Sequence, residues 1–307
     1  MATFRSMNWM ILSLCSSVLL GFYEIAKKAA LRNNAVPPVL FLHVVTAAAL
    51  WLPLLLLPHL DGAWTLPHWL TVDPIGWQEH AMLFAKAVLA GSSWILASYA
   101  LKHLPMSIAS PIRASSPIWT ILIAVLFMHE RPSPGQWLGV TVIVLSFYAF
   151  SVVGKTEGIH FHRDRWVLFM VAGTLLGACS ALYDKYLFQT VRMRPSTVQA
   201  WFSIYLTIVI LPLFVNWWMR LRSSAGFEWR WSIPTIAVLL LMSDFLYFMA
   251  LDQPGAMVSL VSPLRRTSVV IAFVAGIRIY GERNWRPKAV CIASLLVGVY
   301  VLSLARG

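Results

Sequence analysis

The chain has 307 residues and a mean hydropathy of +0.72, and only 12% of its residues are charged. A soluble domain carries about twice that share of charge, so the composition excludes a soluble globular protein. Long unbroken apolar runs also exclude a transmembrane β-barrel, whose strands are short and alternate in polarity. The net charge of +12 is dispersed along loops and helix ends, which indicates headgroup contact and argues against nucleic-acid binding.

Ten stretches are long and apolar enough to cross a bilayer, which needs roughly 20 residues. In chain order they cover residues 8–31, 37–58, 81–101, 106–128, 134–153, 165–188, 197–218, 232–251, 256–279 and 286–304. The first is too long for the apolar part of a secretory signal and has no small-residue cleavage site before its lysines, so we expect it to be a span. The sequence therefore predicts an all-α, multi-pass protein of the cell membrane (the inner membrane in a Gram-negative source).

A short motif occurs twice at a spacing of 152 residues. Ser110-Pro111-Ile112-Arg113 recurs as Ser262-Pro263-Leu264-Arg265, and Glu130-Arg131 recurs as Glu282-Arg283 at the same spacing. This repeat sets the first five predicted spans against the last five. Because five is odd, the second half must cross the membrane in the opposite orientation to the first. Such inverted repeats are typical of secondary transporters, whose sites lie near the midplane between the repeats.

We therefore expect two inverted five-helix repeats, residues 1–153 and residues 165–307, joined by a loop at 154–164 and enclosing a central cavity. The stretch Pro117 to Gly139 (PIWTILIAVLFMHERPSPGQWLG) resembles the EamA-like branch of the drug/metabolite transporter superfamily. A weaker copy follows at Val269 to Cys291, where cysteine replaces the glycine. The resemblance implies ten spans in two inverted repeats and a transport function.

The orientation in the membrane has two conflicting indications. The resemblance implies that both termini lie inside the cell. The loops on the opposite side of the membrane carry more lysine and arginine, and by the positive-inside rule that side is cytoplasmic. The sequence leaves both orientations open.

Two arginines are predicted close to the middle of the membrane, Arg113 and Arg265. Arginine in hydrocarbon is costly unless it faces a cavity or a partner. A guanidinium group stays charged and can bind phosphate or carboxylate through two parallel hydrogen bonds. We expect these two residues and the adjacent Arg266 to bind an anionic substrate. The alternative is a structural role in buried ion pairs.

The placement of these arginines is similar to that of basic residues in the plastid sugar-phosphate translocators, distant members of the same superfamily. That family holds the substrate phosphate with a basic residue in the fourth span and a Lys-Arg pair in the ninth. Arg113 and Arg265-Arg266 occupy the corresponding places, so the resemblance implies an anionic substrate. Lys28 and Lys185 are expected to hold another part of the substrate or to pair with acids. Tyr23 and Tyr183 are candidates for the cavity lining.

Three acidic residues within the predicted spans are candidates for proton coupling, Glu24, Asp184 and Asp244. Glu24 is followed by Lys27 and Lys28 at helical spacing, which predicts an ion pair along one helix face. Asp244 has no basic residue within one turn. An isolated carboxyl group in a low-dielectric site favours its protonated form. The alternative is that one of these acids neutralises a membrane arginine while the site is empty.

Lys27, Lys28 and Lys86 lie near the ends of predicted spans, where long side chains can reach the headgroup region. The sequence has no metal-ligand spacing, no phosphate-cradling glycine loop and no serine-elbow motif. We therefore expect no cofactor, no metal and no enzymatic activity. An internal repeat in one chain favours a monomer.

The leading prediction is a secondary carrier that moves a small anionic metabolite by alternating access. One alternative is a proton-coupled exporter of amino acids or drugs, in which the carboxyl groups act and the arginines are structural. A second is a flippase for a phosphate-bearing lipid, which the same arginines would serve. A third is a membrane enzyme or assembly factor without transport.

Overall fold

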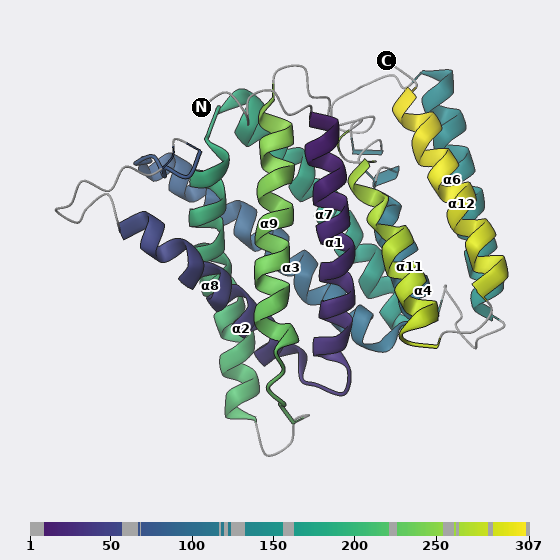
Figure 1. The fold of residues 1–307 in the computed structure, drawn as a ribbon, viewed down its shortest axis with the longest axis horizontal. Coiled ribbons are helices and arrows are strands. Elements are labelled where there is room, and N and C mark those ends of the chain that lie inside the picture. The colour runs from purple at the N-terminus through teal and green to yellow at the C-terminus, as the bar shows by residue number, and fades with distance from the viewer. Residues whose placement is uncertain are drawn as a thin grey trace.

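The fold is a bundle of helices, seen in a computed structural model (Figure 1). It describes residues 9–56, 67, 69–116, 118–119, 122–123, 133–155, 163–220, 226–253, 261, 264–281 and 285–304. The helices are α1 (Trp9–Leu31), α2 (Val36–Leu56), α3 (Trp77–His103), α4 (Met106–Ala114), α6 (Pro134–Lys155), α7 (Arg165–Lys185), α8 (Pro195–Met219), α9 (Ser232–Asp252), α11 (Ser268–Arg278) and α12 (Trp285–Leu304). A π-helical turn, Tyr186–Thr190, extends α7.

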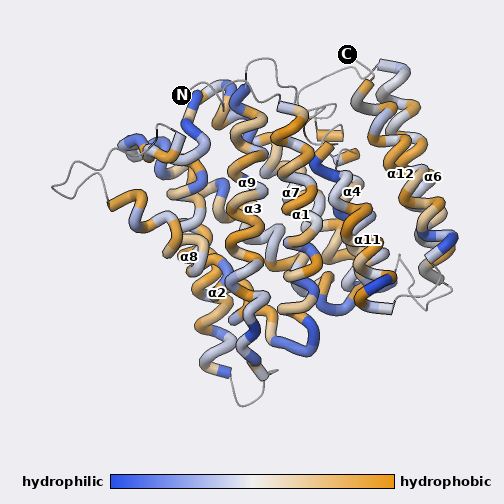
Figure 2. The backbone as a smooth tube through the Cα atoms, viewed as in Figure 1, coloured by the Kyte–Doolittle hydropathy of each residue, from blue (hydrophilic) through white to orange (hydrophobic). Residues whose placement is uncertain are grey.

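Each predicted span overlaps one of these helices. Six of them are long and apolar enough to cross a membrane, namely α1, α2, α3, α7 with its π-helical extension, α8 and α9. Hydrophobic residues run along these helices in Figure 2. In the predicted fourth and ninth spans the described helices, α4 and α11, have 9 and 11 residues. An all-helical, multi-pass membrane architecture is thus confirmed for the described part of the chain.

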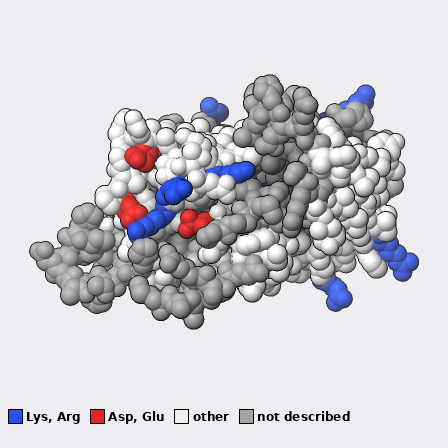
Figure 3. All heavy atoms as spheres, turned by 90° about the horizontal axis from the view of Figure 1, so that it is seen from above, with Lys and Arg blue, Asp and Glu red and all other residues white. Residues whose placement is uncertain are grey.

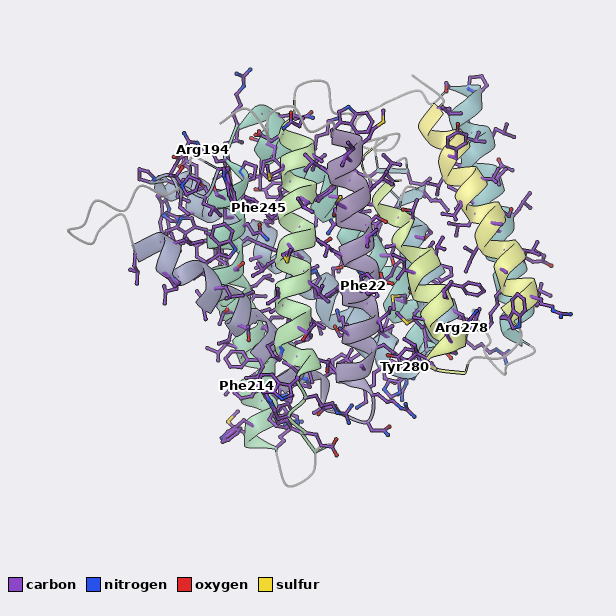
Figure 4. All side chains as sticks on the ribbon, viewed as in Figure 1. Phe22, Arg194, Phe214, Phe245, Arg278 and Tyr280 are labelled. Atoms are coloured by element: carbon purple, nitrogen blue, oxygen red, sulfur yellow. The ribbon has the colours of Figure 1, made fainter. Side chains whose placement is uncertain are left out.

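The outer surface of the bundle suits a lipid environment. Phe22 on α1, Leu145 on α6 and Val290 on α12 are large apolar residues that lie exposed, and Figure 4 shows Phe22 at mid-height of the bundle. Exposed tryptophans such as Trp77 and Trp231 lie at helix ends, where aromatic rings favour the membrane interface. The helices satisfy their own backbone hydrogen bonds, which a bilayer requires.

The packing of helices is symmetric in the two halves of the chain. α1 packs on α9 and α3 packs on α7, while α2 packs on α8, α4 on α11, and α6 on α12. Exchanging the first five predicted spans with the last five converts every one of these pairs into a pair of the same set. Each of these contacts therefore joins the first half of the chain to the second.

Small residues let the crossing helices approach closely. The hydroxyl of Ser16 on α1 donates to the carbonyl of Ser243 on α9 at 2.7 Å, and the Ser243 hydroxyl donates back to the Ser16 carbonyl at 2.8 Å. At the corresponding pair of helices, the Ser93 hydroxyl on α3 donates to the Gly173 carbonyl on α7 at 2.6 Å. Small residues at such interfaces allow backbone-to-backbone packing in membranes.

The close contact between α6 and α12 gives a testable consequence at Gly298. A Cβ atom added there would lie 2.7 Å from a side-chain carbon of Ile143 and 3.0 Å from its backbone nitrogen. Because the helices would have to separate, Gly298→Ala is expected to lower the free energy of unfolding by about 1–3 kcal/mol. Thermal unfolding in detergent measures this. The control is Gly226→Ala, whose added Cβ meets nothing within 4 Å. Equal unfolding temperatures for the two variants would contradict the packing.

Polar contacts tie the helices together at the end of the bundle where α1 and α11 end, the lower end in Figure 1. The Lys28 ammonium donates to the carbonyls of Leu101 and Leu104, both at 2.6 Å. The hydroxyl of Tyr280, labelled in Figure 4, donates to the carbonyl of Ile25 at 3.0 Å. These bonds connect α1 to the end of α3 and to the segment after α11, so side chains from both halves of the chain join the helices at this end.

The opposite face carries its charges unevenly. In the view from above, acidic and basic side chains gather on the side where α2 and α8 lie in Figure 1 (Figure 3). Arg194, just before α8, forms an ion pair of 3.0 Å with Asp73 there and donates to the Thr71 hydroxyl at 2.8 Å. Both charged side chains are exposed, so this pair contributes little stability.

Candidate functional site

A cavity of about 130 Å³ lies inside the bundle, lined by residues from both halves of the chain. Helices α1, α3, α4, α7, α8 and α9 contribute to its described lining, together with the segment 264–266 before α11. The basic lining residues are Lys27, Lys86, Arg113, Arg265 and Arg266, and the acidic ones are Asp184 and Asp244. The three arginines predicted to form a site thus do meet in one cavity.

Arg113 on α4 is paired with Glu24 on α1. Its Nη1 atom lies 3.1 Å from Glu24 Oε1, and the hydroxyl of Ser110 donates to Glu24 Oε2 at 2.8 Å. The proline-containing motif of α4 therefore supplies both a cation and a hydroxyl to one buried carboxylate. The prediction that Glu24 pairs with Lys27 and Lys28 along its own helix is wrong, because the carboxylate faces α4 instead.

Lys86 on α3 forms an ion pair with Asp184 on α7. The lysine is 2% exposed, and its ammonium group also lies 4.6 Å from the ring centre of Phe202 and 5.1 Å from that of Phe248. The expectation that Lys86 reaches the headgroup region is wrong. α3 begins at Trp77, before the predicted start of the span, so Lys86 lies roughly 13 Å along the helix from that end.

Arg265 forms an ion pair with Asp244 on α9. Its guanidinium carbon also lies 4.3 Å from the ring centre of Tyr247. The sequence predicted an isolated carboxyl group at Asp244, because no basic residue lies within one turn of it. The structure shows that this carboxyl group has a partner. Its partner is 21 residues away in the chain and comes from the repeated Ser-Pro motif.

Two cations in the cavity lining have no ion-pair partner among the described residues. Lys27 is 2% exposed, and its ammonium group donates to the Tyr23 hydroxyl at 3.0 Å. Arg266 donates from Nη2 to the Ser116 hydroxyl at 3.1 Å, while its buried Nε finds no acceptor in the described part of the chain. The described lining has five basic and two acidic residues, so it carries an excess of positive charge. Cations held away from water require compensation.

Some of the predicted site residues lie elsewhere. Tyr23 lines the cavity, but Lys28, Lys185 and Tyr183 are not part of its described lining. Lys28 binds carbonyl groups at the end of α3, Lys185 is exposed, and Tyr183 stacks on Tyr186 with ring centres 6.0 Å apart. The sequence motif residues Pro117, Glu130, Arg131, Ser262, Pro263, Glu282 and Arg283 lie outside the described residues.

Sequence reasoning missed Lys27 and Lys86 as cavity residues. Lys27 follows Tyr23 by four residues, a spacing that puts both on one helix face. Because Tyr23 was predicted to line the cavity, the same prediction could have been made for Lys27. Lys86 follows from no local spacing. Its role arises from a contact between α3 and α7, which are far apart in the sequence.

Residues 7–152 match the EamA-like transporter family. Curated relatives are named "Probable 4-amino-4-deoxy-L-arabinose-phosphoundecaprenol flippase subunit ArnE". The protein from Aeromonas salmonicida (strain A449) is 34% identical over 71 residues, which are 22% of this chain and 62% of the relative. The protein from Escherichia coli O139:H28 (strain E24377A / ETEC) is 33% identical over 69 residues, with the same two shares. The match thus spans less than two thirds of the length of these relatives.

A solved structure described as "Crystal structure of protein" has the same fold. It superposes with a TM-score of 0.58 and 15% sequence identity, over 95% of this chain and 98% of its own. The helices that are long and apolar enough to span a membrane are consistent with the match of residues 7–152 to a family of membrane transporters. The chain is a multi-pass membrane protein whose residues 7–152 are similar to the EamA-like transporter family.

Proposed function

We propose that this transporter is a secondary carrier that moves a small anionic metabolite, bearing a carboxylate or a phosphate, by alternating access. The observation that carries this proposal is the charge of the cavity. Five described cations face it, while three carboxylates, Glu24, Asp184 and Asp244, each pair with one of them. A bound anion would offset the desolvation free energy of Lys27 and Arg266, which have no ion-pair partner among the described residues.

The proposed architecture is ten spans in two inverted repeats, residues 1–153 and 165–307. Three observations support it. The Ser-Pro-aliphatic-Arg motif recurs at one spacing. The helix contacts are symmetric in the two halves. The hydrogen bonds between Ser16 and Ser243 and between Ser93 and Gly173 join corresponding helices. Secondary transporters with this plan bind substrate at the interface of the repeats and rock one against the other.

The ion pairs give this plan a mechanism. Arg113 pairs with Glu24 inside the first half, and Arg265 pairs with Asp244 inside the second. An incoming anion competes with those carboxylates for the arginines. A carboxylate displaced from its arginine is left in a low-dielectric site, where the protonated form is favoured. Substrate and proton would then bind together, which makes Glu24 and Asp244 the proton-coupling groups of the proposal.

A ligand-stabilisation screen tests the charge preference of the cavity. The purified protein in detergent is heated with sulfate, inorganic phosphate or succinate, and in parallel with neutral erythritol and cationic choline. Binding to the folded state stabilises it by about 2.7 kcal/mol when the ligand is at 100 times its dissociation constant. We expect an anion to raise the unfolding temperature and the other compounds to leave it unchanged. Stabilisation by choline alone would contradict the anion proposal.

A second candidate function is the flipping of a phosphate-bearing lipid. The likeness to flippase subunits favours it, since the phosphate of such a lipid could occupy the same cations. Liposomes that contain the protein and fluorescent phosphatidic acid distinguish the two functions. Protein-dependent access of a membrane-impermeant quencher to the inner-leaflet lipid would favour the flippase. Uptake of a soluble anion without lipid movement would favour the carrier.

A further inference from the structure

A second, smaller cavity of about 20 Å³ adjoins the cationic one. Trp94, Phe202, Leu240 and Asp244 line both of them, so the two form adjacent parts of one space. The polar residues that distinguish the small cavity come from α2 and α8, namely His43, Gln199 and Ser203. In contrast to the main cavity, no lysine or arginine belongs to its described lining.

Two buried polar atoms in this small cavity lack a hydrogen-bond partner in the described part of the chain, His43 Nδ1 and Gln199 Oε1. The side chains belong to residues that are 1% and 2% exposed. Leaving a buried acceptor or donor unsatisfied is costly, and buried polar atoms in native proteins almost always have a partner. Two such atoms in one cavity therefore point to a group that binds between them.

The hydrogen bonds around Gln199 define what that group must offer. Its Nε2 atom donates to the Leu241 carbonyl at 2.8 Å, which fixes the amide and leaves Oε1 as a free acceptor. The Ser203 hydroxyl donates to the Gln199 carbonyl at 2.8 Å, so its own oxygen can still accept a bond. The small cavity thus presents acceptors and calls for a ligand donor.

The charges nearby decide which donor fits. Asp244, the carboxylate that lines the small cavity, is already paired with Arg265. Lys27 and Arg266 add uncompensated positive charge in the adjoining cavity. An ammonium group would meet this excess of like charge, whereas a hydroxyl group donates without carrying charge. Trp94 has its ring stacked with His43 at 5.5 Å between centres, and it forms the wall that both cavities share.

We infer that the small cavity is a subsite for a hydroxyl group, so that the substrate is a hydroxylated anion lying across Trp94 with its charged end at Arg266 and its hydroxyl end at Gln199. The inference rests on the proposed anion carrier and narrows its substrate class. It explains why a cavity lined by lysine and arginine continues into one whose described lining has neither and includes two polar atoms without a partner.

Two probes with the same charge test the subsite. Glycerol 3-phosphate and propyl phosphate share a three-carbon chain and a phosphate monoester, and differ in two hydroxyl groups. Their dissociation constants are measured by calorimetry on the purified protein. We expect glycerol 3-phosphate to bind about tenfold more tightly, the effect of one good hydrogen bond to a buried acceptor. In Gln199→Met this preference should fall to near one while the affinity for propyl phosphate stays unchanged.

The outcomes separate the subsite from the carrier proposal. Equal affinity of the native protein for the two probes would overturn the subsite and leave a water molecule as the occupant of the small cavity. Failure of both probes, and of sulfate and succinate, would overturn the carrier proposal and the subsite together. His43→Phe provides a second variant, and binding of propyl phosphate by either variant shows that it is folded. A preference that survives in both variants would also overturn the subsite.

Discussion

Replacing Arg266 by glutamine is expected to weaken anion binding by about 30- to 150-fold. The arginine lines the cavity, and its hydrogen-bond acceptor among the described residues is a neutral hydroxyl, that of Ser116. Its charge is therefore available to a ligand. A charge-assisted hydrogen bond contributes about 2–3 kcal/mol, which corresponds to that change in the dissociation constant. The measurement is calorimetric titration with whichever anion stabilises the native protein most.

The matched control for this variant is Arg278→Gln. Arg278 lies at the end of α11, exposed and outside the cavity lining (Figure 4). The substitution of Arg278 removes the same charge from the same half of the chain, and it leaves the cavity lining unchanged. Anion affinity should stay within about twofold of the native value, because an exposed charge is screened. If both variants lose affinity equally, net charge would explain the binding and the cavity would not.

Asp184→Asn is expected to destabilise the protein by about 3–5 kcal/mol, the usual cost of removing one partner of a buried ion pair. The substitution leaves the Lys86 ammonium, 2% exposed, without its carboxylate. Because this pair joins α3 to α7, it also connects the two halves of the chain. The unfolding temperature in detergent reports the loss.

The double variant Lys86→Met with Asp184→Asn tests the reason for that loss. Removing both charges takes away the unpaired buried cation, so most of the stability should return. If the double variant is as unstable as Asp184→Asn alone, packing around Asp184 and not the ion pair would hold the two helices together. Asp244→Asn is not a suitable control, since its partner belongs to the proposed transport machinery.

The helices could be predicted from the sequence because each one carries its own signal. A run of about 20 apolar residues specifies a span locally, and every predicted span overlaps a described helix. The residues at which the helices begin and end were harder to predict. α3 begins at Trp77, although the apolar pattern starts later, because tryptophan and polar residues of the first turn suit the interface. That shift moved Lys86 from the predicted membrane surface into the core.

The three arginines of the site could be predicted because a charge in an apolar run is conspicuous, and a repeated motif marks two of them. That an acid would neutralise a membrane arginine was one of the alternatives, but which acid pairs with which cation could not be predicted. Glu24 and Arg113 are 89 residues apart, and Lys86 and Asp184 are 98 apart. Helical spacing rules describe neighbours on one helix, and they favoured Lys27 and Lys28 as partners of Glu24. Packing of α1 against its neighbours decided otherwise.

The small cavity was beyond prediction for a related reason. His43 and Gln199 stand on α2 and α8, each surrounded by apolar residues in the sequence. Either one alone reads as a hydrogen-bonded core residue. Their significance depends on two atoms that lack hydrogen-bond partners in the same cavity, within the described part of the chain. Which buried atoms lack a partner is known only once the helices are packed.

Counterflow in liposomes tests the central claim most directly. The native protein and Arg266→Gln are reconstituted into liposomes loaded with unlabelled phosphate, succinate or glycerol 3-phosphate, and uptake of the same labelled anion is followed. The carrier account predicts that the native protein accumulates label for at least one anion and that Arg266→Gln, at equal protein content, accumulates far less. Equal uptake by the two proteins, or no uptake of any anion by folded native protein, would contradict it.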